Sequence, residues 1–589
     1  MNLLIPKIMS REVNKVYQQS LEHAGVPSLI ARIIAGRPLH THINIQASFL
    51  PKLQYLSSPF GMKDMDKAIS RIILAIKNQE IIGIETDHDC DGQTSHAVIY
   101  TALTEIFKVP EHKIRSYIGH RMKEGYGLSS AVCERILKDE IRPSLIITAD
   151  NGSADEPRIR KLLDHRIDVI VTDHHEVPLE GPPKSAYACL NPTREDCEYG
   201  DPYIAGCMVA WLLMAGVNGE LEQSKEISSL LDFVAVGTIA DCVSLSRSIN
   251  NRAVVQAGLK KINAGSRPCW QALRPLIKNP KITGADCGFL IGPMLNSDGR
   301  LSDAFGSVNF LLAKSLKDAM PWARELYQQN EARKKIQKTM TDQAMLLARE
   351  QVLLGRASIV LFLTEGHAGV HGITASRIKE AFGRPVIIFS PKEGEGELIT
   401  GSARSIDEVH IKLALDQVAQ KIPNIIKKHG GHRGAAGLVI DKLGLDKFTE
   451  IFELEILNFI NSNNLNKNIL GPKILIDGEL ESQEINLGLL DQLQQLEPFG
   501  REFEAPVFKI KARAIKLKKV GDGTHLQCQL VLNNQEKYAG IFFGGGADLL
   551  DPDLEALEGR EVEAIIELAD NYFRGRELQF LIRHWDFGV

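Results

Sequence analysis

The chain has 589 residues, more than one hydrophobic core usually organises, so about three or four domains are expected. Its 44% hydrophobic and 24% charged residues are typical of an ordinary globular protein. The net charge of −5 excludes a globally basic nucleic-acid binder, so a polyanionic partner has to be held by local basic patches or by metal ions.

The cysteines and the apolar segments indicate the cellular compartment of the protein. Nine cysteines include no CxxC pair, which argues against a disulfide framework and against a structural zinc site. The N-terminus lacks the apolar core of a secretory signal, and the longest apolar run, 207–217, is too short to span a bilayer. We therefore expect a cytoplasmic protein, a monomer, with no membrane partner.

The first half of the chain alternates between helical and apolar segments. Residues 1–60 are mixed, with helical stretches and no recognisable motif. Short apolar runs then follow amphipathic stretches, and the runs lie at 81–84, 145–147 and 169–171. This alternation is typical of βαβ units with a parallel sheet buried on both faces. The expected fold class is α/β.

The second half begins with a long helical segment. Residues 322–350 lack glycine and proline, and they predict a connecting helix about 45 Å long. Its basic stretch, 333–335, is either a solvated face or a phosphate contact. A strand at 358–363 then precedes a loop, a helix and another strand, and from about residue 470 short strands with turn signals predict a small β-barrel or sandwich. The expected domains are 1–60, 61–315, 316–355, 356–465 and 466–589.

A lysine-rich strand lies in the last domain. Lys509, Lys511 and Arg513 share one face of this strand, whereas Lys516 and Lys518 take the other parity, which indicates a β-bulge. The strand is either the basic groove of an oligonucleotide-binding barrel or a lysine-lined edge that prevents aggregation.

Acidic and imidazole groups follow each apolar run of the first half. The runs end in ETDHDCDG, TADNGS and VTDHHE, and a further stretch, DFVAVGTIAD, ends in Asp241 and is either strand or helix. The carboxyl ends of parallel strands share one edge of the sheet, so these groups are expected to converge there. An EF-hand is excluded because position 12 counted from Asp87 is Val98.

Carboxylates gathered at one edge of the sheet repel one another, so they need bound cations, raised pKa values or contact with open water. Two unit charges 4 Å apart repel by roughly 4 kcal/mol at an effective dielectric constant near 20. A solvated loop remains the alternative for any single motif. Together the groups offer the hard oxygen and imidazole ligands that suit two Mn²⁺ or Mg²⁺ ions in phosphoryl displacement, and the groups are Asp89, Asp91, Asp150, His174 and Asp241.

These motifs, in order, resemble those of the DHH phosphoesterase superfamily. The matching stretches are DHDCDG, TADNG, VTDHH and VAVGTIAD, with KKHGGHRGAAGL resembling the DHH-associated domain. Further stretches resemble its bacterial single-strand-specific 5′ to 3′ DNA exonucleases, and they are HRMKEGYGLS, GPMLNSDGRL, HGITASRIKEAFGRPVIIF, GSARS and EPFGREFEAPVF. The resemblance covers about residues 55–589. It implies a parallel-sheet DHH domain and a DHH-associated α/β domain joined by a long helix, with a C-terminal oligonucleotide-binding β-barrel.

The resemblance also implies roles for single residues. Asp89 and Asp91 would each bind one metal ion, with Asp87 as a further ligand, and Asp150 would bridge the two ions. His174 and Asp241 would complete the second ion, and His175 would face the scissile phosphate, oriented with His174 by Asp173. Substrate contacts are implied at Arg121, Arg300, Ser376, Arg377, Arg404 and His432. Ser376 and Arg377 are expected at the start of a helix, where free backbone N–H groups favour a phosphate.

The implied function is hydrolysis of single-stranded DNA from the 5′ end in DNA repair and recombination, with a single-strand-binding protein and a RecQ-type helicase as partners. The alternatives are a small-substrate phosphodiesterase of the same superfamily and a non-catalytic DNA-binding scaffold. The sequence departs from the family at Met294, where arginine is expected, and at Ser297 and Asp298, where small residues are expected. A carboxylate at position 298 is unfavourable beside a polyanion.

Overall fold

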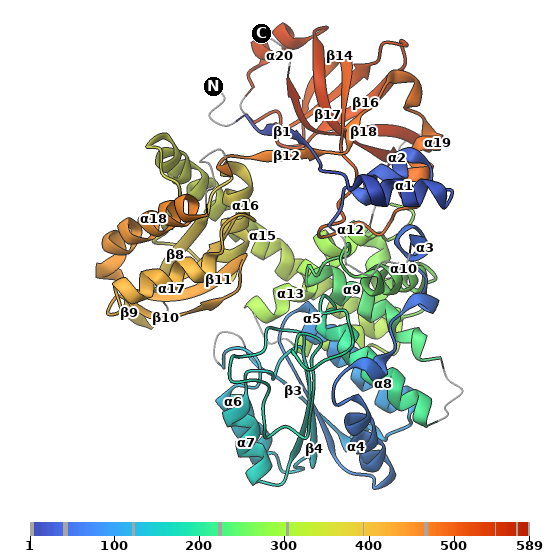
Figure 1. The fold of residues 1–589 in the computed structure, drawn as a ribbon, viewed down its shortest axis with the longest axis vertical. Helices are drawn as coiled ribbons and strands as arrows, with labels where there is room; N and C mark the ends of the chain where they lie inside the picture. The colour runs from blue at the N-terminus through green and yellow to red at the C-terminus, as the bar shows by residue number, and fades with distance from the viewer. Residues whose placement is uncertain are drawn as a thin grey trace. The chain divides into compact units, whose positions relative to one another are not determined.

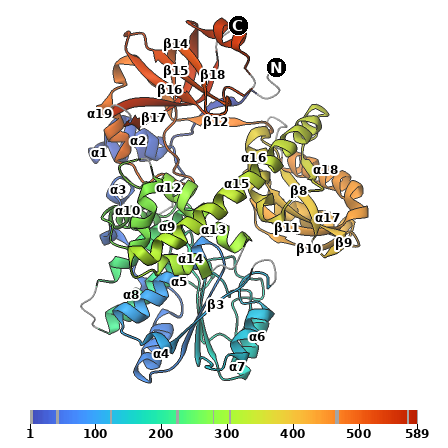
Figure 2. The same cartoon turned by 180° about the vertical axis from the view of Figure 1, so that it is seen from behind.

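The computed structural model describes residues 5–38, 45–120, 124–221, 226–277, 279–301, 305–392, 394–463, 469–547, 549–572 and 575–586. The chain forms two compact units. The larger unit comprises Ser10–Tyr327 with Ile476–Val589, and the smaller unit comprises Met1–Met9 with Gln328–Leu475. Figures 1 and 2 show the ribbon from opposite sides. Among the described residues, no helix combines the length and the apolar character needed to cross a bilayer.

A parallel sheet organises the first part of the larger unit. Its strands lie in the order β3 (Ile114–Ile118), β2 (Ile82–Thr86), β4 (Leu145–Ala149), β5 (Asp168–Thr172) and β6 (Ala188–Leu190). Every neighbouring pair is parallel. The three apolar runs predicted from the sequence are β2, β4 and β5, so the expected α/β class is confirmed.

Helices cover both faces of this sheet, as Figures 1 and 2 show. On one face lie α4 (Met65–Lys77), α5 (Cys90–Thr101) and α8 (Gly206–Glu220), and on the other lie α6 (Ser130–Lys138) and α7 (Glu156–Asp164). Alternate strand residues enter two separate cores: Ile82 and Ile84 pack in the first, and Ile146 and Val169 pack in the second. Burial on both faces explains why these strands read as continuous apolar runs.

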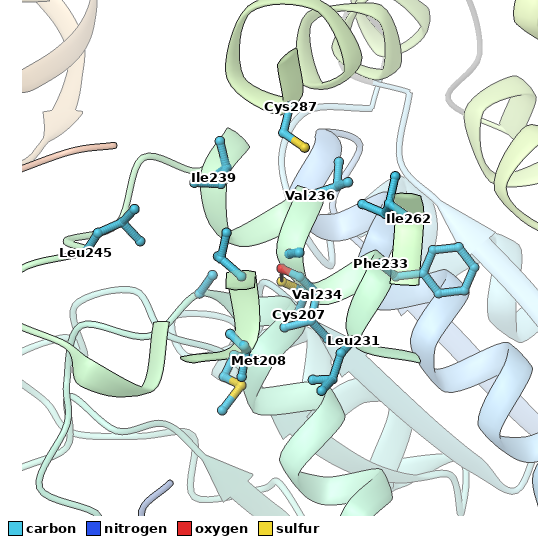
Figure 3. Packing of buried hydrophobic residues seen from close by; sticks show 14 of the residues in the cluster. Cys207, Met208, Leu231, Phe233, Val234, Val236, Ile239, Leu245, Ile262 and Cys287 are labelled. Carbon is cyan, nitrogen blue, oxygen red and sulfur yellow. Dashed lines mark hydrogen bonds between the residues drawn. The ribbon is translucent and has the colours of Figure 1, made fainter. Parts of the chain in front are cut away.

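The stretch that ends in Asp241 is a helix, α9 (Leu231–Ala240). Its residues are buried on all sides, and Figure 3 shows Val234 beside Cys207 of α8. Further helices of this part are α10 (Ile249–Asn263), α11 (Pro268–Leu273), α12 (Gly284–Asp286), α13 (Gly292–Leu301) and α14 (Phe305–Leu311). The N-terminal helices are α1 (Lys15–His23), α2 (Ser28–Ala35) and α3 (Ile45–Phe49).

The C-terminal part of the larger unit is a closed β-barrel. Its sheet order is β13 (Gly478–Glu479), β14 (Phe508–Val520), β15 (His525–Val531), β16 (Lys537–Phe542), β18 (Glu577–Asp586) and β17 (Glu561–Asn571), and pairing of β14 with β17 closes it. Two helices accompany it, α19 (Leu487–Gln494) and α20 (Asp551–Leu557). The pairing of β14 with β15 shifts between Ile515 and Lys518, where Lys516 has a φ of 55°. The β-bulge predicted from the lysine parity is confirmed.

The smaller unit contains its own five-stranded sheet, in the order β10 (Ile426–Gly431), β11 (Ala435–Asp441), β9 (Glu395–Arg404), β8 (Val386–Lys392) and β7 (Ile359–Phe362). Its helices are α16 (His371–Phe382), α17 (Ile411–Lys421) and α18 (Leu445–Ser462). The predicted connecting helix is α15 (Leu316–Leu353); it is longer than 322–350 and contains Pro321. A short ribbon pairs β1 (Lys7–Ser10) with β12 (Lys473–Ile476).

Candidate metal centre and catalytic site

The acidic and imidazole groups predicted from the sequence come together in the larger unit. Asp87 follows β2, Asp150 follows β4, His174 lies just beyond β5, and Asp241 caps the end of α9. Three overlapping groups each have ligand atoms within 4.8 Å of one another, and these groups are Asp87, Asp89 and Asp150; Asp91, His174 and Asp241; and Asp150, His174 and His175. Loops distant in sequence therefore share one site.

His174 lies at the centre of these groups. Its Nε2 atom is 3.1 Å from Asp150 Oδ1, 3.6 Å from Asp241 Oδ2 and 3.9 Å from Asp91 Oδ2. Both His174 Nε2 and Asp150 Oδ1 are buried without a hydrogen-bond partner. Buried polar atoms are rarely left unsatisfied, so these two atoms fit the ligands of a bound cation.

The turn after β2 places its aspartates through backbone contacts. Asp89 caps α5, and its Oδ1 accepts hydrogen bonds from Asp91 N at 3.0 Å and Gly92 N at 3.1 Å. A Cβ at Gly92 would lie 2.2 Å from the carbonyl oxygen of Asp87, so only glycine fits there. Asn296 Oδ1 accepts from Cys90 N at 2.8 Å and ties α13 to this turn.

The start of α8 holds Asp91. Gly206 N donates to Asp91 Oδ2 at 2.7 Å, and Cys207 N donates to Asp91 Oδ1 at 2.9 Å. These are free N–H groups of the first helical turn, where the helix dipole favours a carboxylate. A Cβ at Gly206 would lie 2.8 Å from the Cβ of Asp150, and Asp150 itself has a φ of 64°. The start of α8 is therefore closely packed against both Asp91 and Asp150.

Asp173 orients both histidines. Its Oδ1 accepts from His174 N at 2.7 Å and from His175 N at 3.1 Å, and its Oδ2 accepts from Ser153 N at 2.9 Å. The ring of His175 contacts the same carboxylate through Nδ1 at 2.8 Å, and the His175 side chain is 60% exposed. Asp173 thus holds the backbone of both histidines and the ring of His175, while much of the His175 side chain remains exposed.

Burial and mutual repulsion set the protonation of the carboxyl groups. Burial, followed by the charges of Asp91 and Asp89, raises the pKa of Asp150 well above its ordinary value. The same causes raise the pKa of Asp241, and burial with Asp87 and Asp91 raises that of Asp89. Burial opposes ionisation of Asp87 too, but contact with His88 outweighs it, and the pKa of Asp87 is lowered.

The two histidines shift in opposite directions. Burial, together with the charge of His175, lowers the pKa of His174, so this imidazole is held as the neutral ligand form. Burial also acts to lower the pKa of His175, but its hydrogen bond to Asp173 outweighs burial and raises the pKa to about 10. The neutral imidazole of His174 is thus suited to bind a metal ion, and the ring of His175 is suited to act as a cation.

The predicted substrate residues lie in several places. In the smaller unit, a Cβ at Gly372 would lie 2.5 Å from Arg404 Nη2, so Arg404 lies against the first turn of α16. Arg404 pairs with Ala435, whose carbonyl accepts from His432 N at 2.8 Å. Arg121 lies outside the described residues, and of Arg300 only the backbone, in α13, is described.

The position expected for Ser376 and Arg377 was wrong. Helix α16 begins at His371, so both residues lie in its second turn, where the backbone N–H groups are used within the helix. A phosphate contact from these residues has to involve their side chains.

The residues of α13 that depart from the family pattern are buried. Met294 is 1% exposed, and Ser297 is 0% exposed. Asp298 is 3% exposed, and its carboxylate accepts from Ser307 N at 2.7 Å, which ties α13 to α14. Asp298 therefore acts as a buried hydrogen-bond acceptor within the protein.

Comparison with known proteins agrees with this fold. The description "DHH family, N-terminal domain" matches residues 81–238, "DHHA1 domain" matches 356–458, and "RecJ OB domain" matches 476–584. The single-stranded-DNA-specific exonuclease RecJ of Dickeya dadantii is 33% identical, covering 95% of this chain and 96% of that protein. RecJ of Escherichia coli is 32% identical over 98% of both chains.

Solved structures share the fold. The Mn²⁺ complex of RecJ from Thermus thermophilus has a TM-score of 0.77 at 23% identity, covering 99% of this chain and 79% of that one. Another structure, exonuclease RecJ bound to manganese, has a TM-score of 0.57 at 28% identity, covering 69% of this chain and 98% of that one.

The parallel sheet with its acidic rim, the associated α/β domain and the barrel define the class, that of DHH phosphoesterases with an oligonucleotide-binding domain. Within that class, the chain belongs to the RecJ family.

Proposed function

We propose that this chain is a single-stranded-DNA-specific exonuclease that hydrolyses phosphodiester bonds from the 5′ end with two divalent ions, Mn²⁺ or Mg²⁺. The observation that carries the proposal is the convergence of carboxylates and imidazoles on one buried site, with ligand atoms within 4.8 Å of one another. Membership of the RecJ family supports the substrate and the direction of hydrolysis.

The grouping of the side chains supports one assignment of ligands. Asp87, Asp89 and Asp150 would hold one ion, and Asp91, His174 and Asp241 would hold the other. Asp150 would bridge the two ions, because its Oδ1 lies 3.1 Å from His174 Nε2. When bound, such a pair of ions supplies Lewis-acid stabilisation of the charge that develops on the phosphate oxygens.

His175 would contact the phosphate directly. Its Nδ1 stays bonded to Asp173, which leaves Nε2 of an exposed, protonated ring to donate to a non-bridging oxygen. Charge-assisted hydrogen bonds of this kind are stronger than neutral ones. Further phosphate contacts are proposed at Arg121, Arg300, Ser376, Arg377, Arg404 and His432, and the barrel would hold the strand along its basic β14.

The proposal extends to the working context of the protein. We expect it to act as a monomer in the cytoplasm, with a single-strand-binding protein and a RecQ-type helicase as partners. The domain boundaries proposed are 1–60, 61–315, 316–355, 356–465 and 466–589. Family membership supports these statements, and size measurement and pull-down with each partner would check them.

The decisive experiment compares Asp150→Ala with wild type on single strands labelled at either end, with and without Mn²⁺ and with a duplex control. Loss of the bridging carboxylate is expected to abolish cleavage and to leave single-strand binding largely intact. Asp164→Ala, at the end of α7 on the opposite edge of the sheet, is the matched control and should cut normally. Undiminished Mn²⁺-dependent turnover by Asp150→Ala would refute the assignment.

The same assay separates the alternatives. Wild-type activity on dinucleotides with none on long strands would identify a small-substrate phosphodiesterase. Absence of Mn²⁺-dependent hydrolysis on every single strand would identify a non-catalytic scaffold.

A further inference from the structure

A tight turn in the segment between α19 and the barrel lies beside the catalytic site. Gly500 N donates to Phe503 O at 3.0 Å, and Phe503 N donates to Gly500 O at 3.1 Å. Arg501 and Glu502 form the tip of this turn, and Glu502 has a φ of 61°. We refer to Gly500–Phe503 as the 500 turn.

The 500 turn is fixed to the segment that follows Asp241. Leu245 N donates to Arg501 O at 3.0 Å. Arg247 Nε pairs with Glu502 Oε2 at 3.0 Å, and a Cβ at Gly500 would lie 2.7 Å from Leu245 Cδ1. Because Leu245 follows Asp241 by only a few residues, these contacts set the position of Arg501 relative to the metal site.

The base of the turn is packed as firmly as a core. Phe503 is 2% exposed, and the guanidinium of Arg252 lies 4.0 Å from the centroid of its ring. Arg252 also donates to Leu496 O at 2.9 Å, just before the turn. A rigid base means that the position of Arg501 does not depend on a mobile loop.

The side chain of Arg501 is exposed to solvent. Its guanidinium makes no hydrogen bond or ion pair with any part of the chain that the structure describes, whereas the neighbouring Arg247 and Arg252 are both engaged. The turn also lies against the helix that ends in Asp241, because a Cβ at Gly500 would lie 3.5 Å from Ile239 Cδ1 in α9. A fixed cation with free donors thus stands near a proposed metal ligand.

We propose that Arg501 binds a phosphate of the DNA strand next to Asp241, so that the segment leading to the barrel completes the catalytic site. This inference rests on the proposed function, since it takes the strand as the ligand. A planar guanidinium pairs with two phosphate oxygens at once. A purely structural role would require Arg501 to be paired with protein groups, as Arg247 is.

The test uses full-length Arg501→Gln, Arg501→Lys and, as a matched control, Arg166→Gln. Arg166 is an exposed arginine just before β5, on the opposite edge of the sheet from the metal site. Binding of a labelled single strand is measured in EDTA across a series of salt concentrations, and cleavage is measured with Mn²⁺. Thermal melting confirms that each variant is folded.

Arg501→Gln is expected to bind about tenfold more weakly, which corresponds to about 1.4 kcal/mol, because a charge-assisted hydrogen bond to the phosphate is lost. The slope of log K against log salt should fall by about 0.7, the value for one phosphate contact on a single strand. The increase in KM should match the loss of affinity. Arg501→Lys should keep the salt slope and lose part of the affinity, and Arg166→Gln should match wild type.

Unchanged binding and salt slope in Arg501→Gln would overturn the proposal. Normal binding with impaired cleavage would also overturn it, because Arg501 would then act on Asp241 and not on a phosphate. Failure of the proposed function looks different. A wild-type protein that cuts no strand with Mn²⁺ would refute the nuclease, while the binding difference in EDTA would still report on Arg501.

Discussion

At the scale of single residues, Gly206 shows how little room the site leaves. A Cβ at this position would lie 2.8 Å from Cβ of Asp150 and 2.9 Å from its Cα, and no flexible side chain can absorb the clash. We expect Gly206→Ala to displace Asp150 or the start of α8 and to lower kcat about 100-fold, since a shift near 1 Å at a reacting centre has effects of that size. Steady-state cleavage of a single strand measures this loss.

Gly219 provides the control for Gly206. It lies near the other end of the same helix, α8, and a Cβ there meets nothing within 4 Å. Gly219→Ala should leave cleavage unchanged and stabilise the protein by up to about 1 kcal/mol through helix propensity. Equal activity of the two variants would show that Asp150 tolerates the displacement.

Single residues also show what the sequence could and could not predict. Asp87, Asp89, Asp150 and His174 were predictable, because they follow apolar strands and parallel strands end at one edge of the sheet, whereas Asp241 follows the buried helix α9. Gly206 and Arg501 carry no local signal. They reach the site from segments far along the chain, and only tertiary packing reveals their roles.

At the scale of elements, the pattern of burial decided which predictions succeeded. Helix α9 could not be distinguished from a strand, because it is buried on all sides and its sequence carries no periodicity. The start of α16 was misplaced because Val370, its N-cap residue, makes no side-chain cap and so carries no start signal. Strands β2, β4 and β5 were found because continuous apolar runs bounded by polar residues are typical of buried parallel strands.

The packing of α5 on the sheet makes the stability of the fold depend on pH. His96 in α5 is 0% exposed, and its Nε2 lies 2.9 Å from Ser116 Oγ in β3. Burial lowers its pKa to about 3. The unfolded chain binds a proton at this histidine below about pH 6.5, whereas the folded chain does not, so stability is full above that pH and is lost as the pH falls toward 3.

When the pH falls from about 7 to about 5, we expect protonation of His96 in the unfolded chain to lower the free energy of unfolding of the wild type by about 2 kcal/mol. His96→Gln lacks the titrating group, so its stability should fall less over the same interval, although its stability at pH 7 is lower than that of wild type. Urea denaturation at both pH values gives the two differences. Parallel losses in wild type and variant would remove His96 as the cause.

At the scale of the larger unit, the N-terminal segment and the barrel are joined by a buried ion pair. Arg37, just after α2, contacts Asp477, just before β13, with Nη1 to Oδ1 at 2.5 Å, and the two side chains are 0% and 1% exposed. Arg37 Nη2 also donates to Glu504 O at 3.0 Å, one residue beyond the 500 turn. The barrel, the N-terminal helices and the turn that carries Arg501 are thus held by one polar cluster.

Removing Asp477 tests this cluster. Asp477→Asn removes the close, buried counter-ion of Arg37 and leaves only the half-exposed Glu504, 4.0 Å away. The expected loss of stability is about 3–5 kcal/mol, because a poorly compensated buried charge costs far more than a surface pair contributes. Glu504→Gln breaks the ion pair with Arg11, in which the Glu504 side chain is 51% exposed. This variant should lower the free energy of unfolding by less than about 1 kcal/mol. Urea denaturation of both variants measures the contrast. If Asp477→Asn were no worse than Glu504→Gln, the barrel would be held by its apolar contacts, and the rigid placement of the 500 turn would need another cause.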